Sequence, residues 1–319
     1  MSEPLVELRL WRQFLAVAEE LHFGRAARRL HMTQPPLTQA IAQLERLLAV
    51  RLFERSKRSV ELTPAGAALL APARELLARA QALPAQARAA AAGETGRLRL
   101  AFVSTVGFSQ LPQWLRRWRA QQPQVQMELI ESTGDLQLEA LARGDIDAGF
   151  MLHSPGFAPA GLHHLAVARE PLVLALPEAH PLAGAPRLAL ATVLQEPLVI
   201  FPRRIVPSLH DAILGMYHAA GREPRIAQEA IQMQTIVNLV SAGLGLAWVP
   251  ESVREFQRSG VVYRQLGGKQ AASVPGCETT LVWGEVSPVL ERFVAFVAKE
   301  VSPAGAAFAN PAYKKLSYG

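Results

Sequence analysis

The segment from residue 23 to residue 45 constrains the fold of this chain most. It reads FGRAARRLHMTQPPLTQAIAQLE and predicts two short helices with a tight break at residues 31–33, the second helix beginning at Gln34. Apolar residues recur at helical spacing and form one inward stripe across both helices. They are Ala27, Leu30, Leu37, Ile41 and Leu44. The segment therefore predicts a compact helix pair with one buried and one exposed side.

The exposed side of this helix pair carries cations and short polar side chains, the groups that contact phosphates and base edges. A small bihelical unit of this kind suits the major groove of DNA. We expect base contacts from Gln34, Pro35, Pro36, Thr38 and Gln39. We expect phosphate contacts from Arg28, Arg29, Arg55 and Arg58. For each single arginine, an ordinary solvated surface charge is the alternative.

Basic charge is concentrated in this N-terminal region. Between Arg9 and Arg58 the chain has ten Lys/Arg and four Asp/Glu, whereas residues 93–319 hold twenty and nineteen. An excess confined to one segment suits a polyanion such as nucleic acid. A solvated helix surface would also account for a basic segment, but the adjoining helix pair favours DNA.

The elements around the helix pair complete an N-terminal domain, which we place at residues 1–62. A helix is expected at 5–21, with Leu8, Trp11, Phe14, Leu15 and Ala18 on one face. Residues 51–62 predict a two-stranded ribbon, or wing, with a basic tip at 55–58. Thr63-Pro64 then starts a helix with a capping hydroxyl and a proline in the first turn.

Residues 63–92 predict a long helix rich in Ala, Leu and Arg. So long a helix cannot bury itself against a small neighbour, and its leucine seam (Leu69, Leu70, Leu76, Leu77 and Leu83) favours a partner helix. A linker helix and a dimerisation helix are both compatible with this pattern. Pro72 and Pro84 should bend the helix or end it early. Residues 93–96 are expected to form a hinge.

Beyond residue 96, strand-like runs alternate with amphipathic helices, the βαβ rhythm of an α/β fold with a mostly parallel sheet. Strands are expected at 98–103, 125–131, 148–152, 171–177, 198–201, 226–230, 246–249 and 279–284. Helices are expected at 110–121, 136–143, 209–221, 234–242 and 288–300. Residues 303–319 are expected to be a poorly ordered tail.

Composition and spacing argue against several other classes of protein. The single cysteine, Cys277, excludes an internal disulfide and is expected to be an inert thiol. Neither a signal peptide nor a membrane span is evident, which favours a cytoplasmic protein. Scattered histidines give no metal site, and no Gly-rich phosphate loop appears. Asp145 and Asp147 are the one carboxylate pair to consider. We expect no enzyme activity, no cofactor and no metal.

Five motifs in order carry a family resemblance over essentially the whole chain. They are FLAVAEELHFGRAARRLHMTQPPLTQAIAQLE, LFERSKRSVELTPAG, GRLRLAF, LARGDIDAGF and LVSAGLGLAWVP. The chain resembles the LysR-type transcriptional regulators, and HFGRAA and AFVSTVGF resemble the branch that controls aromatic catabolism. Thr38 and Gln39 depart from the Ser and Arg frequent in the family, which leaves the operator sequence open.

The resemblance implies a winged helix-turn-helix, a dimerising linker helix and an effector domain like periplasmic binding proteins. The effector domain would comprise subdomain I, residues 97–167 and 272–302, and subdomain II, residues 168–271. Family members are usually tetramers on promoter DNA with dyad symmetry, and RNA polymerase is a further possible partner. An effector would bind between the subdomains, near the carboxyl ends of strands.

The expected ligand is a small organic or aromatic acid that acts as co-inducer. The residues expected to hold it are Ser104, Thr105, Thr133, Phe201, Pro202, Arg203, Gln232 and Thr235. Helix capping is the alternative role of the three hydroxyl residues, and Arg204 could point inward in place of Arg203. A solute-binding protein or an enzyme built on the same two-lobed domain is the rival interpretation.

Overall fold

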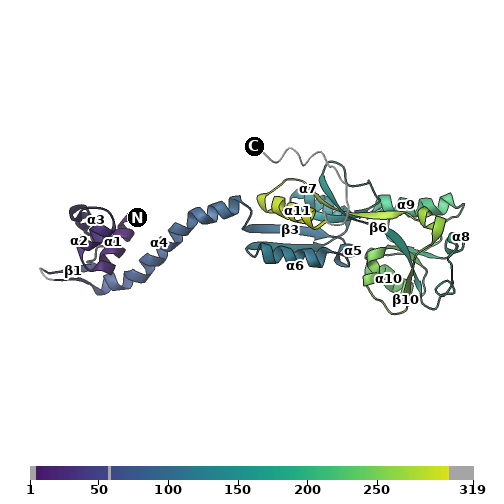
Figure 1. Ribbon diagram of the computed structural model, residues 1–319, viewed down its shortest axis with the longest axis horizontal. Helices are drawn as coiled ribbons and strands as arrows, with labels where there is room; N and C mark the ends of the chain where they lie inside the picture. Colours follow the sequence, from purple (N-terminus) through teal and green to yellow (C-terminus); the bar gives the residue numbers. More distant parts are fainter. Residues whose placement is uncertain (1–4, 57–58, 302–319) are drawn as a thin grey trace. The chain divides into compact units, whose positions relative to one another are not determined.

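The structure, a computed structural model, describes residues 5–56 and 59–301, so Arg58 and the expected tail at 303–319 lie outside the described residues. The chain forms two compact units, Met1–Arg88 and Ala89–Gly319 (Figure 1).

The N-terminal unit is a three-helix core with a small wing. It consists of α1 (Leu8–Glu20), α2 (Phe23–Arg29), α3 (Gln34–Leu48), β1 (Phe53–Arg55), β2 (Val60–Leu62) and α4 (Pro64–Ala91) as far as Arg88. The expected helix pair is confirmed, because Ala27, Leu37, Ile41 and Leu44 are all buried. Leu30 is only half-buried, and Leu8, expected on the inner face of α1, is 46% exposed.

Two local features set the geometry of this unit. His31 adopts a left-handed conformation (φ 57°) in the break between α2 and α3, and the Met32 amide bonds the Ala27 carbonyl there at 3.0 Å. The Thr63 hydroxyl accepts a hydrogen bond from the Gly66 amide at 3.0 Å, which caps α4 as expected. A side chain at position 66 would collide with the Leu52 carbonyl, so glycine allows α4 to lie close to the wing.

Helix α4 has 28 residues and contains Pro72 and Pro84 within its length. The expectation that a proline could end the helix early is wrong. Ala73, next to the first proline, is buried against the N-terminal core, and Leu69, Leu70 and Leu77 pack on the same core. Pro72 has no amide hydrogen, so one backbone hydrogen bond of the helix is missing there. The packing on the core compensates for this loss and keeps the helix continuous.

The C-terminal unit contains a seven-stranded sheet in the order β10-β6-β11-β5-β3-β4, with β9 also paired to β6. Its strands are β3 (Gly96–Phe102), β4 (Val125–Glu131), β5 (Ala148–His153), β6 (His163–Pro177), β9 (Ala247–Pro250), β10 (Val261–Arg264) and β11 (Gly276–Trp283). Strand β3 pairs in parallel with β4 and β5. Strands β6 and β11 are antiparallel to their neighbours, so the sheet is mixed and not mostly parallel.

Two hydrophobic cores divide this unit into two lobes. Lobe I surrounds β3, β4 and β5 with α5 (Ser104–Gly107), α6 (Leu111–Gln121), α7 (Gly134–Arg143) and α11 (Pro288–Val301). Its core includes Trp118 packed edge-on against Phe293, with ring centroids 5.1 Å apart.

Lobe II surrounds β9, β10 and the parallel pair β7 (Leu198–Ile200) and β8 (Ile226–Glu229). Its helices are α8 (Leu190–Val193), α9 (Pro207–Ala219), α10 (Met233–Ser241) and the 3-10 turns η1 (Glu251–Glu255) and η2 (Gly268–Ser273). The buried run 172–176 of β6 forms the centre of its core. Strand β6 therefore belongs to both lobes, pairing with β11 in one and with β9 and β10 in the other.

Candidate nucleic-acid interface and ligand pocket

The first turns of α3 present the side chains expected to contact bases. Gln34, Pro35, Pro36 and Gln39 are exposed, while Thr38 is half-buried. The Thr38 hydroxyl donates to the Gln34 carbonyl at 3.1 Å, so its hydrogen is engaged within the helix and its oxygen remains an acceptor. These five residues occupy the first turns of α3. This arrangement would allow the amino-terminal end of the helix to enter a groove of DNA.

The wing is joined to α3 through Glu45. One oxygen of this carboxylate accepts hydrogen bonds from the Leu52 and Phe53 amides at 2.9 and 3.2 Å, and the other pairs with Arg55 at 3.4 Å. The Arg55 guanidinium also lies 4.6 Å from the centre of the Phe23 ring. Arg55 therefore anchors the wing to α2 and α3.

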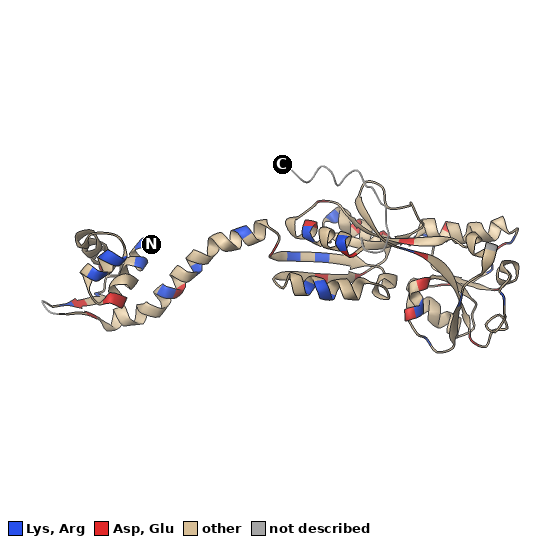
Figure 2. Ribbon diagram, in the orientation of Figure 1, with Lys and Arg blue, Asp and Glu red and all other residues tan. Residues whose placement is uncertain are grey.

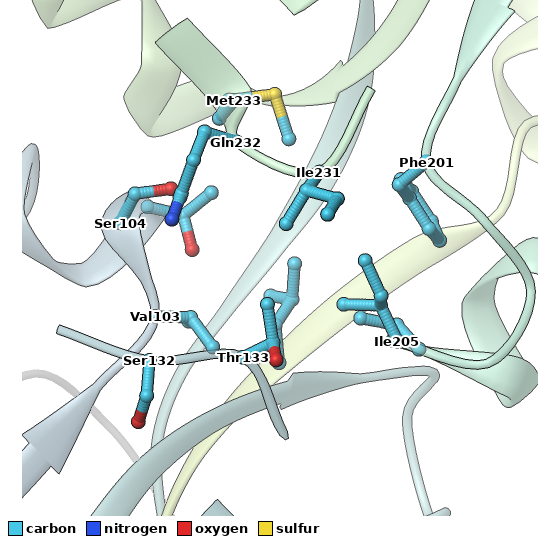
Figure 3. Close-up of a pocket in the computed structure, with 12 residues that line it drawn as sticks. Val103, Ser104, Ser132, Thr133, Phe201, Ile205, Ile231, Gln232 and Met233 are labelled. Atoms are coloured by element: carbon cyan, nitrogen blue, oxygen red, sulfur yellow. The ribbon is translucent and has the colours of Figure 1, made fainter. Parts of the chain in front are cut away.

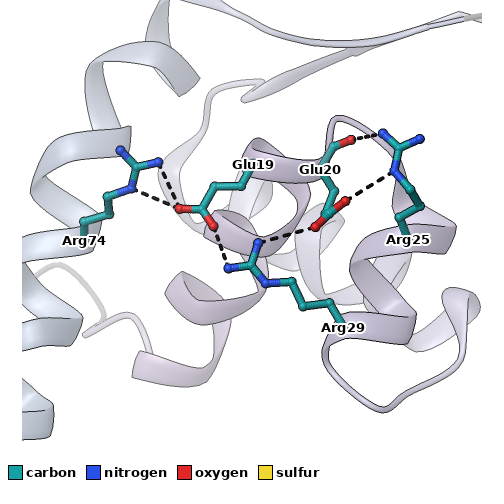
Figure 4. Close-up of polar contacts among 5 residues, drawn as sticks. All are labelled: Glu19, Glu20, Arg25, Arg29 and Arg74. Carbon is teal, nitrogen blue, oxygen red and sulfur yellow. Dashed lines mark hydrogen bonds and ion pairs between the residues drawn. The ribbon is translucent and has the colours of Figure 1, made fainter.

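A chain of alternating charges ties α1 to α2 and α4 (Figure 4). Glu19 accepts from Arg74 at 2.9 and 3.0 Å and pairs with Arg29 at 2.7 Å. Glu20 pairs with Arg25 at 3.2 Å and with Arg29 at 3.5 Å. Arg29, expected to contact phosphate, and its neighbour Arg25 are thus engaged by acids of the same unit.

Arg28 differs from these two arginines. It is exposed and makes no ion pair within residues 5–56 and 59–301. Of the cations expected on phosphates, Arg28 is the one whose charge is not already balanced in the described structure. This distinction depends on tertiary contacts, and no feature of the local sequence marks it.

Arginines also occur on α6 and β3 of the C-terminal unit (Figure 2). Several of them have acidic partners. Arg99 and Asp147 form a pair at 2.7 Å, Arg97 pairs with Glu128, and Arg117 pairs with Glu300. These pairs agree with the balanced charge of this region and offer little attraction to a polyanion.

A pocket lies between the two lobes of the C-terminal unit (Figure 3). Ser104 and Thr105 of α5 line it together with Ser132 and Thr133, which follow β4. Lobe II contributes Phe201, which follows β7, and Gln232, which precedes α10. The Ser104 and Gln232 side chains lie close together on one side, with Phe201 and Ile205 on the other.

Five of the eight residues expected at this pocket line it: Ser104, Thr105, Thr133, Phe201 and Gln232. Pro202, Arg203 and Thr235 do not. Arg203 is held instead by two hydrogen bonds of 2.7 Å to Asp211 on α9, and its neighbour Arg204 pairs with Asp135 at 2.9 Å. Among the described residues, none with a charged side chain lines the pocket.

The residues that sequence reasoning missed are mainly apolar. They are Val103, Ser132, Leu152, Ile205, Val206, Ile231 and Met233. Polar residues that follow a predicted strand can be recognised in the sequence as candidate ligand contacts. An apolar residue that lines the pocket cannot be distinguished there from a residue of the core.

Two details bear on what this pocket could hold. The Thr105 hydroxyl is buried and has no hydrogen-bond partner among the described residues, a rare condition that a ligand acceptor would relieve. The cavity has a volume of only about 40 Å³, room for roughly three water molecules.

Other candidate sites are not supported in the described part of the chain. Asp145 pairs with Arg143 at 2.7 Å, while Asp147 pairs with Arg99, so the two carboxylates do not act together. No group of three or more His, Cys, Asp or Glu side chains there could hold a metal ion. Cys277 is buried in β11, and burial raises the pKa of its thiol, as expected for an inert cysteine. None of the helices described is both long and apolar enough to cross a bilayer.

Comparison with known proteins agrees with this architecture. The family model "Bacterial regulatory helix-turn-helix protein, lysR family" matches residues 8–67, and "LysR substrate binding domain" matches residues 91–302. The HTH-type transcriptional regulator IlvR of Caulobacter vibrioides is 45% identical over 93% of this chain and 99% of its own length. AlsR of Bacillus subtilis is 40% identical over 82% of this chain and 86% of its own.

A solved structure shows the same organisation bound to DNA. Full-length CbnR in complex with its target DNA has a TM-score of 0.79 and 32% identity, covering 93% of this chain and 100% of CbnR. Relatives along the whole chain are thus transcriptional regulators. The protein belongs to the LysR family: it is a DNA-binding transcriptional regulator with an N-terminal winged helix-turn-helix and a C-terminal effector-binding domain.

Proposed function

We propose that the interlobe pocket binds a small organic acid with one carboxylate and an apolar body, and that this ligand modulates promoter binding. The observation that carries the proposal is the composition of the wall. Five lining residues carry hydroxyl or amide groups, namely Ser104, Thr105, Ser132, Thr133 and Gln232, and the other seven lining residues are apolar. A compact polar head on an apolar body, aliphatic or aromatic, matches this wall.

The absence of a charged lining residue limits the ligand further. Hydroxyl and amide donors can stabilise one carboxylate, with the unpartnered Thr105 hydroxyl as the first candidate. A second carboxylate would be buried without a cation, which is strongly unfavourable. Dicarboxylates should therefore bind worse than monocarboxylates of similar size.

The small cavity indicates that ligand entry requires the lobes to separate. About 40 Å³ is too little for an aromatic or branched aliphatic acid. Binding would then shift the distribution between closed and wider arrangements of the lobes, which is how a ligand changes a conformational equilibrium.

At the DNA, Gln34, Pro35, Pro36, Thr38 and Gln39 would contact bases, and Arg28, Arg29, Arg55 and Arg58 phosphates. Gln34 and Gln39 each suit an adenine edge. We further propose a cytoplasmic homodimer through α4, assembled into a tetramer that acts with RNA polymerase on promoter DNA. The complex of CbnR with its target DNA supports the DNA part of this proposal.

Isothermal titration calorimetry of the full-length protein tests the ligand. The panel contains linear, branched and aromatic monocarboxylates, each paired with the dicarboxylate of similar length. Thr105→Val should weaken binding of the best acid by about tenfold or more, the loss of one hydrogen bond to a charged group. Thr235→Val, outside the pocket, is the matched control. If no acid binds, or if dicarboxylates bind best, the proposed ligand class is wrong.

A gel shift tests the output. The protein should retard DNA from upstream of its own gene specifically, and the best acid should change that affinity. Failure to bind this DNA even at low salt would argue against it as a target.

A further inference from the structure

One ion pair crosses between the two lobes beside the pocket. Asp135, in the first turn of α7 in lobe I, pairs with Arg204, in the loop after β7 in lobe II, at 2.9 Å. The Asp135 side chain is 27% exposed and that of Arg204 63%. The pair is therefore open to water on the Arg204 side and of modest strength.

The same carboxylate is also bonded to the pocket wall. The Thr133 hydroxyl donates to one Asp135 oxygen, while Arg204 donates to the other. Thr133 lines the pocket, as does Ile205, which directly follows Arg204. Partial burial alone would raise the pKa of Asp135, but the hydrogen bonds from Thr133 and Leu136 and the charge of Arg204 outweigh it and lower the pKa.

The neighbouring arginine provides an internal contrast. Arg203 and Asp211 form an ion pair with two hydrogen bonds of 2.7 Å, but both residues belong to lobe II and neither lines the pocket. Two adjacent arginines thus make similar contacts, and only Arg204 joins the lobes.

We propose that Thr133, Asp135 and Arg204 form a latch that holds the empty effector domain closed and that an acid in the pocket loosens. The inference rests on the proposed function of the pocket. A hydroxyl can donate only one hydrogen bond at a time. A ligand carboxylate that accepts the hydrogen bond of Thr133 therefore removes that bond from Asp135. Without that hydrogen bond the Asp135 side chain is no longer held in the orientation in which it meets Arg204, and the like charge of the ligand repels it. The contact with Arg204 is then made less often, which favours wider lobes.

Distances between the lobes in the ligand-free protein provide the first test. Spin labels are attached at Gln121→Cys in lobe I and Ala219→Cys in lobe II, both exposed positions, while the buried Cys277 stays unlabelled. Labelled protein is mixed with an excess of unlabelled full-length protein so that pulsed dipolar spectroscopy reports distances within one chain.

Arg204→Ala should add a population at longer distance, and Thr133→Val should do so to a smaller extent. Thr133→Ser, which keeps the hydroxyl, and Arg203→Ala should match the parent protein. A parent-like distribution for Arg204→Ala refutes the latch. A parent-like distribution for Thr133→Val refutes its connection to the pocket.

Calorimetry with the best monocarboxylate of the panel provides the second test. Because the ligand must loosen the latch, Arg204→Ala should bind the acid more tightly, by about twofold to fivefold, the range for one exposed ion pair. Arg203→Ala should bind it as the parent does. Unchanged or weaker binding by Arg204→Ala overturns the proposal. If no acid binds the parent protein, the proposed ligand class fails, and the ligand-free distances still decide whether the latch exists.

Discussion

At the scale of single residues, Glu19 joins helices of the N-terminal unit that are separate in the sequence. It contacts Arg29 of α2 and Arg74 of α4 from one carboxylate, so it joins three helices. Burial raises its pKa, but the hydrogen bonds and charges of Arg74 and Arg29 outweigh this and lower the pKa below the ordinary value of 4.5. Networks of this kind are worth more than isolated surface pairs.

Glu19→Gln should therefore lower the thermal stability of the N-terminal unit by a few degrees at pH 7. A lowered folded pKa means that the stabilisation is fully present above the ordinary pKa of 4.5 and is lost as the pH falls through the folded value. Thermal unfolding of parent and variant between pH 7 and pH 3 measures this difference. Glu75→Gln is the control, since Arg79 is the one ion-pair partner of Glu75 among the described residues and both lie on the exposed face of α4. A stability difference that does not shrink with acid would contradict the assignment.

Arg28 is the residue on which the phosphate assignment is most sharply tested. Its charge has no acidic partner in the described structure, so Arg28→Ala should weaken binding to all DNA sequences alike. The slope of log affinity against log salt should fall by about one. Fluorescence anisotropy with specific and random duplexes at several salt concentrations measures both quantities, with Arg79→Ala as the control. An unchanged slope would place Arg28 away from the phosphates.

Arg55→Ala should also weaken DNA binding and reduce the slope of log affinity against log salt by about one, as we expect for a phosphate contact from the wing. Because Arg55 contacts Glu45 and the Phe23 ring, this variant should in addition lose thermal stability. Arg28→Ala should not, since Arg28 lacks such contacts. The pair of variants thus separates phosphate contact from anchoring of the wing.

At the scale of elements, the sequence predicted most helices and strands, but not where β6 begins. We expected a strand over residues 171–177. The strand begins at His163, since Arg169 pairs with Glu278 on β11 and Glu170 is held by Ser252. Those partners lie about 80 or more residues away in the sequence, so no local pattern could reveal them.

The same limit explains the partial success at the pocket. Ser104, Thr105 and Thr133 follow strands, and that position is visible in the sequence. Whether Arg203 or Arg204 turns toward lobe I depends on Asp135 and Asp211, which compete for the two guanidinium groups. Adjacent arginines with equal local surroundings cannot be distinguished without the tertiary structure.

Glu170 gives an element-scale prediction for the strand that joins the lobes. Burial raises its pKa despite hydrogen bonds from the Ser252 amide at 2.6 Å and hydroxyl at 3.1 Å. A raised folded pKa means that the charged form destabilises the fold, so stability falls as the pH rises from 4.5 through the folded value. Glu170→Gln should raise the melting temperature at pH 8, by about 2–4 °C for each kcal/mol. The gain should vanish near pH 4. Equal or lower stability at pH 8 would show that the Ser252 contacts require the charge.

At the scale of the whole molecule, α4 carries leucines that the described part of the chain leaves exposed. Leu69, Leu70 and Leu77 pack on the N-terminal core, whereas Leu76 is 42% and Leu83 61% exposed. Two exposed leucines seven residues apart lie on one helix face. A second α4 would bury them, and this supports the proposed homodimer.

Leu76→Glu together with Leu83→Glu should therefore shift the protein toward monomers without unfolding it. Repulsion between carboxylates on paired helices adds to the loss of apolar burial, about 25 cal/mol for each Å² no longer buried. Sedimentation velocity over a range of concentrations measures the assembly, and circular dichroism checks the fold. Leu244→Glu, at a 39% exposed leucine in a turn of lobe II, is the control. Binding to a DNA site with two half-sites should weaken far more than binding to one half-site. Only the site with two half-sites requires two DNA-binding domains joined in one dimer. An unchanged sedimentation coefficient would assign dimerisation to another surface.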